Sequence, residues 1–296
     1  MTTRIVTANG AGLCTETFGD PGDPAVLLLA GATCSMDWWE DEFCERLAAG
    51  GRYVIRYDYR DTGESVSYPA GDPSYGFDDL VADAAGLLRA LDVTTTNLVG
   101  VSLGGAIACK LALAYPGTVA SLTLASTSPG MRPASPPASD LPMMAPRLLA
   151  RFTSPEPAPE PDWSDRAAVT EHLVEGQRLL AGSRGFDADR VRSIAAGVAA
   201  RTRDPRASTV NHGAIDPGEP YRHRLPEITV PTLVLHGTED PLFPLGHGEA
   251  FTRELEHARL IPLDGTGHAA PPPETWDTVI PELVRHTSDS VQDRRT

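Results

Sequence analysis

Short apolar runs recur along this chain, and stretches with the apolar spacing of helices separate them. The first runs lie at 25–30 (AVLLLA), 52–57 (RYVIRY), 96–101 (TNLVGV) and 121–126 (SLTLAS). Strands that are apolar on both faces are expected in a parallel sheet, because helices cover both of its faces. Helical patterns between the runs, such as FDDLVADAAGLLRALD, provide the crossovers that parallel strands need. We therefore predict the α/β class, with a mostly parallel, doubly wound sheet.

The two ends of the chain extend this sheet. The opening IVTANGAGLCTETFGD has two alternating runs around Asn9 and Gly10, residue types that accept the positive φ of a tight hairpin turn. It predicts an antiparallel hairpin ahead of the parallel strands. Near the other end, strand patterns return at 230–237 and 258–263, and helical patterns follow at 246–256 and 275–286.

A long interruption separates the two parts of the sheet pattern. From 129 to 225 no strand pattern is visible, and the prolines of SPEPAPEPD are unsuited to a sheet ladder or a helix interior. Helical patterns occupy much of the rest, at 141–152, 164–180 and 186–203. Because neither flanking part completes a sheet alone, we predict a core domain at 1–128 and 226–296 with a helical cap, or lid, inserted at 129–225.

The charge balance argues against an anionic partner. The net charge is -15, with 25 Lys plus Arg against 40 Asp plus Glu, so the chain would repel nucleic acid and anionic lipid at long range. The first residues lack an export signal, and no apolar run approaches the roughly 20 residues that span a bilayer. We expect a cytoplasmic protein that binds neither nucleic acid nor membrane. The four cysteines have no C-x-x-C spacing, which predicts unpaired thiols and no zinc site.

The motif Gly100-Val101-Ser102-Leu103-Gly104 carries the strongest chemical signal. A serine that presents its hydroxyl above a sheet sits on a sharp turn from strand to helix, where glycines on both sides relieve crowding. Here the motif follows an apolar strand pattern and opens a helical pattern rich in small residues, which is the context it requires. We predict Ser102 as a nucleophile. The alternative is a glycine-flanked serine that caps an ordinary helix.

A serine nucleophile needs a base, and an acid that orients the base. Among the eight histidines we select His268, because it follows the last strand pattern, at the sheet edge where catalytic groups gather. The acid should follow another strand, between serine and histidine in the chain. Asp240, in HGTEDPLFP, fits. Glu239 is expected to point away, and Asp264 to shape the turn before His268.

Acyl transfer also needs N–H donors for the oxyanion of the tetrahedral intermediate. The N–H of Leu103 supplies one, and we select Ala32 for the second, with Gly31 as a one-residue alternative. Candidate substrate contacts are Gly31, Thr33, Trp38 and Trp39, although the interpretation we favour for the tryptophans is packing of the cap on the sheet. No cofactor and no metal are required by this chemistry.

The segment RYDYRDTGES contains the ionisable residues Asp58, Arg60 and Asp61. The turn residues Thr62 and Gly63 follow these charges, which favours a loop pinned by hydrogen bonds from side chains to backbone. We predict a structural role for this loop.

With these residues assembled, the chain resembles the α/β-hydrolase superfamily over nearly its whole length, the cap excepted. Closer still, TFGDPGDPAVLLLAG, RYDYRDTGES, SYGF, NLVGVSLGG, TVPTLVLHGTEDP and GTGHAAP resemble aclacinomycin methylesterase and related bacterial esterases. That resemblance implies removal of the methyl group from a carboxymethyl ester of a glycosylated polyketide, with oxyanion donors at Leu103 and Ala32. Ala30-Gly31-Ala32 departs from the His-Gly of the wider superfamily, and the cap shows little similarity.

These assignments predict a serine esterase that works by two-step acyl transfer on a small-molecule ester. The same three residues also serve cofactor-free haloperoxidases, thioesterases and carbon–carbon hydrolases. A different class of function is a ligand-binding member of the fold without activity. The sequence leaves the natural substrate and the oligomeric state open.

Overall fold

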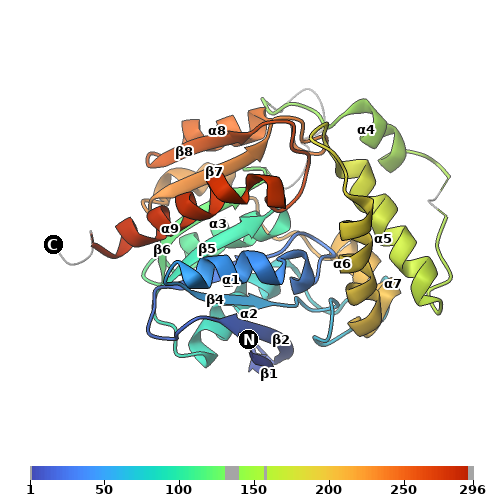
Figure 1. Cartoon of the computed structure of the whole chain (residues 1–296), viewed down its shortest axis with the longest axis horizontal. Coiled ribbons are helices and arrows are strands. Elements are labelled where there is room, and N and C mark those ends of the chain that lie inside the picture. The colour runs from blue at the N-terminus through green and yellow to red at the C-terminus, as the bar shows by residue number, and fades with distance from the viewer. Residues whose placement is uncertain (1, 131–139, 157–158, 293–296) are drawn as a thin grey trace.

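The computed structural model describes residues 2–130, 140–156 and 159–292 of the chain. One sheet of eight strands, in the order β1-β2-β4-β3-β5-β6-β7-β8, lies at the centre of this part (Figure 1). The strands are β1 (Thr2–Ala8), β2 (Ala11–Phe18), β3 (Ala25–Leu29), β4 (Tyr53–Tyr57), β5 (Thr96–Val101), β6 (Val119–Ala125), β7 (Thr232–Gly237) and β8 (Ala258–Leu263). β2 pairs antiparallel with β1 and β4, and the other neighbours are parallel. The predicted fold class is confirmed.

The local sequence explains both kinds of strand. Every residue of β3 through β7 is buried, as expected for apolar strands covered on both faces. The β1–β2 hairpin turns at Asn9 and Gly10, whose φ angles of 48° and 74° are both positive, as a tight primed turn requires.

The helices of the core cover the two faces of the sheet. They are α1 (Asp41–Ala49), α2 (Phe77–Ala90), α3 (Leu103–Ala114), α8 (Gly246–Glu254) and α9 (Trp276–Gln292), with short 3-10 turns η1 (Met36–Trp38) and η3 (Pro273–Thr275). α1 packs against α9 on one face, and α2 packs against α3 on the other. Strand order reverses at β3, because the chain passes from β3 to β4 in one direction and then returns to β5. In open α/β sheets, ligands bind at the carboxyl edge beside such a reversal.

In the described part of the segment between β6 and β7, the regular secondary structure is all helical. We call this set the helical insertion: α4 (Pro146–Phe152), α5 (Arg166–Leu180), α6 (Ala188–Arg201), α7 (Pro205–Ala214) and the 3-10 turn η2 (Arg222–Glu227). In Figure 1, α4 to α7 stand beside the sheet at one end of the molecule. The predicted cap at 129–225 also includes residues 131–139 and 157–158, which lie outside the described residues, so its bounds stay a prediction.

Two details of the insertion differ from the sequence-based expectation. The helix expected from 141 begins only at Pro146, because Pro142 and Pro146 suit a helix start and not its interior. The helix α7 was not predicted. Pro205 occupies its first turn, and the Asp204 side chain accepts the N–H of Ala207 at 2.9 Å, which is a regular start that the apolar pattern alone did not reveal.

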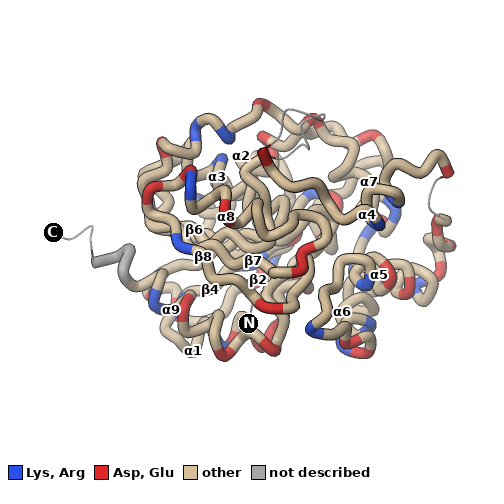
Figure 2. The backbone as a smooth tube through the Cα atoms, turned by 90° about the horizontal axis from the view of Figure 1, so that it is seen from above, with Lys and Arg blue, Asp and Glu red and all other residues tan. Residues whose placement is uncertain are grey.

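The surface carries charges of both signs. Figure 2 shows Lys and Arg interspersed with Asp and Glu over the described part of the chain. No helix within the described ranges combines the length and the apolar character needed to cross a bilayer. Cys14, Cys34, Cys44 and Cys109 are all free thiols, as predicted.

Candidate active site

Ser102 occupies the turn between β5 and α3. Its φ of 52° and ψ of −116° lie outside the regions that a serine ordinarily adopts. A Cβ added to Gly104 would overlap the carbonyl oxygen of Leu29, and one added to Gly100 would lie 2.6 Å from the backbone nitrogen of Gly105. The two glycines therefore permit the backbone of β3 and of α3 to approach the turn closely, as the motif predicted.

The turn is also held from β6. The Thr127 hydroxyl, just beyond this strand, donates to the carbonyl oxygen of Ser102 at 2.7 Å. The Ser102 N–H donates to the carbonyl oxygen of Ala125 at 3.1 Å. These bonds fix the strained residue from both of its peptide groups, so the direction of its side chain is set by the sheet.

The structure brings His268 to Asp240. The Nδ1 atom of His268 lies 2.8 Å from Oδ2 of Asp240, and the backbone N–H groups of Leu242 and Phe243 donate to Oδ1 at 2.9 and 2.8 Å. Burial raises the pKa of Asp240, but the His268 imidazole and these hydrogen bonds outweigh it and place the pKa below its ordinary value. An ionised Asp240 accepts the Nδ1 proton, which leaves Nε2 of His268 as the basic atom.

Neither alternative acid approaches His268 in this way. Glu239 is exposed and accepts from the backbone N–H and the hydroxyl of Ser183, at 2.7 and 2.6 Å. In the described part of the chain, the Asp264 carboxylate accepts only a long contact from the Thr238 hydroxyl, at 3.5 Å. Of these three carboxylates, Asp240 is the one that contacts the His268 ring.

A second buried histidine lies behind Asp240 and was not assigned to the site from the sequence. Nε2 of His236 is 2.6 Å from the carbonyl oxygen of Phe243 and 3.7 Å from Oδ2 of Asp240. Burial lowers the pKa of His236, although the charge of Asp240 raises it. Its place at the end of β7, four residues before Asp240, was the signal that could have indicated this contact.

The loop after β3, residues 31–37, approaches Ser102 from the neighbouring strand. We call it the oxyanion loop, after the role predicted for it. Its first residues form a turn closed by the N–H of Cys34 on the carbonyl oxygen of Gly31 at 3.2 Å. A Cβ added to Gly31 would lie 3.7 Å from Cβ of Ser102, in van der Waals contact. Ala32, in the middle of the turn, is exposed and lines the same cavity as Ser102.

The predicted first oxyanion donor, Leu103, begins α3. Its N–H belongs to the first turn of the helix, whose N–H groups have no acceptor within the helix, and the helix dipole makes this end positive. The Leu103 side chain is buried in the core. An N–H at this position is therefore suited to an oxygen that carries negative charge.

A cavity of about 510 Å³ connects these groups. Ser102 and His268 line it from the core, together with Gly31, Ala32 and Thr33. Much of the opposite wall comes from apolar residues of the helical insertion and its connections, namely Phe152, Leu173, Leu180, Phe186, Val191 and Ile194. Within the described ranges, no three His, Cys, Asp or Glu side chains are grouped to hold a metal ion.

The two tryptophans differ in their surroundings. Trp38 lines the cavity and packs against buried residues of α5 and α6, including Val174 and Val191. Trp39 also borders the cavity but is only 2% exposed, and its ring lies 5.3 Å from that of Phe43 in the core. Trp38 thus forms part of the cavity wall, whereas Trp39 mainly packs in the core.

Known proteins resemble this chain in sequence and in fold. The family model of the alpha/beta hydrolase fold matches residues 24–274. Over 286 residues the chain is 35% identical to rhodomycin D methylesterase DauP of Streptomyces sp. strain C5, and equally to rhodomycin D methylesterase DnrP of Streptomyces peucetius; each match covers 92% of this chain and 93% of the relative. The solved structure of esterase RhEst1 from Rhodococcus sp. ECU1013 has a TM-score of 0.73 at 19% identity, covering 96% of this chain and 99% of that one.

The chain therefore belongs to the α/β hydrolase fold family. Within this family it is a carboxylic ester hydrolase, and the predicted resemblance to bacterial methylesterases is confirmed by relatives that match it almost end to end.

Proposed function

We propose that this ester hydrolase works through an acyl-enzyme on Ser102, with His268 as general base and Asp240 as the residue that orients it. The observation that carries the proposal is the bond from Nδ1 of His268 to the buried Asp240, which leaves Nε2 available on the side of the cavity that Ser102 also lines. A serine on a strained turn, a histidine on a second loop and an acid on a third form the arrangement known from serine hydrolases on several folds.

The reaction then runs in two halves. The Ser102 oxygen attacks the ester carbonyl carbon while Nε2 of His268 takes the hydroxyl proton, and collapse of the tetrahedral intermediate returns this proton to the leaving alcohol. A water molecule next attacks the acyl carbon and gives its proton to His268. The second collapse releases the carboxylic acid and passes the proton back to the oxygen of Ser102.

Two backbone N–H groups are proposed to bind the oxyanion in both halves. The Leu103 N–H at the start of α3 is one, and the Ala32 N–H in the oxyanion loop is the other. Support for Ala32 comes from its neighbours: a Cβ added to Gly31 would lie 3.7 Å from Cβ of Ser102, which places this end of the loop beside the nucleophile, and the N–H of Thr33 is already bound to another acceptor, Nδ1 of His212. A donor fixed before the reaction needs no reorganisation as charge develops.

The substrate we propose is a methyl ester of a bulky apolar acid. A volume of about 510 Å³ with an apolar wall is in the range of sites that bind ligands of drug size. The relatives DauP and DnrP are named rhodomycin D methylesterases, and the alcohol that leaves a methyl ester is small. The helical insertion, taken as the cap at 129–225, would hold the acyl part, with Trp38 and Thr33 beside the reacting carbonyl.

The experiment is a panel of methyl, p-nitrophenyl and thioesters of graded acyl size, assayed with wild type, Ser102→Ala and the exposed control Ser193→Ala. Ser102→Ala should lower kcat for the activated ester by on the order of 10⁴-fold, with the control unchanged. Methyl esters of large acids should have the highest kcat/KM. Near-normal turnover by Ser102→Ala would exclude the acyl-enzyme, and a preference for thioesters would exclude the proposed substrate class.

A further inference from the structure

The oxyanion loop is bound by side chains of the helical insertion. His212, on α7, is only 8% exposed, and its Nδ1 atom lies 2.9 Å from the backbone nitrogen of Thr33. Its other ring nitrogen, Nε2, lies 2.9 Å from the carbonyl oxygen of Arg60. Because Nδ1 accepts the Thr33 N–H, the ring proton must be on Nε2, where it donates to Arg60. The neutral imidazole therefore bridges two loops of the core from outside the sheet.

The contact with His212 supports a strained backbone conformation at Thr33. Thr33 has a φ of 64°, a conformation that a β-branched residue rarely adopts. It is the third residue of the turn that Gly31 and Cys34 close, and a positive φ at this position normally requires Gly or Asn. A strained residue persists only when its surroundings hold it. The bond from its N–H to His212 holds the peptide group that joins Ala32 to Thr33.

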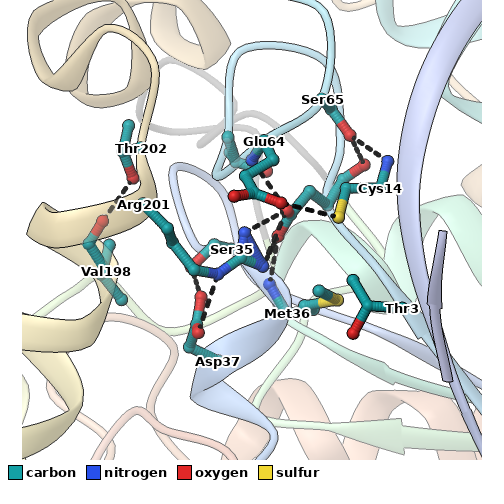
Figure 3. Close-up of polar contacts among 12 residues, drawn as sticks. Thr3, Cys14, Ser35, Met36, Asp37, Glu64, Ser65, Val198, Arg201 and Thr202 are labelled. Carbon is teal, nitrogen blue, oxygen red and sulfur yellow. Dashed lines mark hydrogen bonds and ion pairs between the residues drawn. The ribbon is translucent and has the colours of Figure 1, made fainter. Parts of the chain in front are cut away.

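A second contact holds the other end of the same loop (Figure 3). Arg201, the last residue of α6, donates to Asp37 at 3.0 Å and to the fully buried Asp58 at 2.6 Å. Asp58 in turn accepts the backbone N–H of Met36 at 2.9 Å. The loop is thus fixed at Thr33 through α7 and at residues 36 and 37 through α6. Ala32, the proposed donor, lies between Thr33 and the start of the loop.

We propose that His212 is a positioning residue for the oxyanion donor: by accepting the Thr33 N–H, it fixes the peptide next to Ala32 so that the Ala32 N–H points at the substrate oxygen. This rests on the proposed function. His212 does not line the cavity, so it acts on the reaction through Thr33. The helical insertion then does more than enclose the substrate, because it completes the catalytic geometry of the core.

Two substitutions separate positioning from packing. In His212→Asn, the amide oxygen replaces Nδ1 and still accepts from Thr33. In His212→Gln, the longer side chain reaches the position of Nε2, keeps a donor for the Arg60 carbonyl oxygen and leaves the Thr33 N–H without its acceptor. Glutamine also fills more of the space between the rings of Tyr59 and Tyr75, which lie 5.9 and 6.5 Å from the imidazole. A packing role therefore favours Gln, and a positioning role favours Asn.

The test measures kcat and KM for a p-nitrophenyl ester, the rate of labelling by a fluorophosphonate, and the Tm of each variant. We expect His212→Gln to lose about 10- to 100-fold in kcat and in labelling rate with little change in KM, and His212→Asn to keep most of both. In a Thr33→Gly background the loss caused by His212→Gln should shrink, because glycine adopts a positive φ without support.

The outcomes distinguish this inference from the proposal on which it rests. If Ser102→Ala abolishes turnover while the Asn and Gln variants have equal kcat, or Gln has the higher one, the positioning role is wrong and the acyl-enzyme stands. If the two variants differ only in Tm, His212 is a packing residue. If Ser102→Ala retains turnover, the proposed function itself fails.

Discussion

Two neighbouring loops at the carboxyl edge of this sheet each hold a residue with positive φ, and they hold it by different means. Ser102, with a φ of 52°, is flanked by glycines against which adjacent backbone packs, and it is bound by groups at the end of the next strand. Thr33, with a φ of 64°, is bound by a histidine that follows it by 179 positions, on a helix of the insertion.

The difference shows how the site divides its geometry between local and distant sequence. The turn at Ser102 belongs to the core, and its requirements are visible within five residues. The oxyanion loop depends on α6 and α7, so the precision of one proposed oxyanion donor is set by a segment that also shapes the cavity. We therefore expect substitutions in the turn at Ser102 to destabilise the whole fold. Substitutions that remove the contacts of α6 or α7 with the oxyanion loop should alter mainly that loop.

The largest effect is expected for Gly104→Ala. Its added methyl group would lie against the carbonyl oxygens of Leu29 and Ala30, backbone atoms that cannot move without displacing β3. We expect a loss of more than about 3 kcal/mol in the free energy of unfolding, measured with urea. The control is Gly117→Ala, where no atom lies within 4 Å of the added methyl group. Equal stability of the two variants would show that the core turn is not held by close backbone packing.

The next effect concerns Arg201, the residue of α6 that binds Asp37 and Asp58. Arg201→Gln leaves Asp58 buried without its cationic partner, and should cost about 2 kcal/mol. The control is Arg192→Gln, on the same helix, whose ion pairs with Glu171 and Asp189 are exposed and should contribute far less to stability. Similar losses of stability in both variants would show that the buried ion pair of Arg201 with Asp58 has no special role.

The Arg201 substitution should also change the dependence of stability on pH. Burial raises the pKa of Asp58 to about 7, against the lowering effect of the Arg201 charge and of backbone hydrogen bonds. Because the pKa of Asp58 is raised in the folded state, the contribution of this one group to stability is greatest at low pH. That contribution falls as the pH rises from about 4 through about 7. Without Arg201 the pKa rises further, so the deficit of Arg201→Gln should be larger at pH 8 than at pH 5. A deficit independent of pH would contradict this.

A smaller pH effect of opposite sign is expected at His212. Burial lowers the pKa of this imidazole, although the bond to the Arg60 carbonyl and the charge of Asp61 raise it. The neutral form is favoured in the folded state, so stability is present above the ordinary pKa of histidine and is lost as the pH falls below it. Between pH 7 and pH 5, wild type should lose more stability than His212→Asn in urea titrations. Parallel curves would show that His212 does not titrate with unfolding.

The smallest effect is expected at the strained residue of the oxyanion loop. Thr33→Gly removes the strain of a positive φ but adds freedom to the unfolded chain, whereas Thr33→Ala keeps the strain. We expect the Gly variant to be more stable than the Ala variant by about 0.5 kcal/mol in thermal unfolding. If Ala is the more stable of the two, the turn is not strained at this position.

The same division explains what the sequence could predict. The strands, the hairpin at Asn9 and Gly10, and the turn at Ser102 follow from short-range patterns, since each needs only its own residues and their apolar spacing. Asp240 and His268 could be selected because the ends of strands in a parallel sheet meet at one edge. Their contact at 2.8 Å agrees with that reasoning.

His212 and Arg201, the residues of the insertion that bind the oxyanion loop, could not be predicted in this way. His212 lies on α7, which begins at a proline and has no regular apolar period, so no short-range pattern places it beside Thr33. Arg201 was included in a helical pattern, but its partner Asp58 is 143 positions away. The prediction that RYDYRDTGES is a pinned structural loop was correct for its backbone contacts, as the bond from Glu64 N–H to Asp58 at 3.0 Å shows. It did not include the contacts with the insertion.

The most direct test is a crystal structure of the chain after reaction with a phosphonate that mimics the tetrahedral intermediate. We expect phosphorus bonded to Oγ of Ser102, and its oxygen within about 3 Å of the backbone nitrogens of both Leu103 and Ala32. His268 should lie within hydrogen-bonding distance of the adduct while Nδ1 of His212 remains on the Thr33 N–H. An adduct on another residue, or a phosphonyl oxygen that neither N–H reaches, would contradict the proposed site.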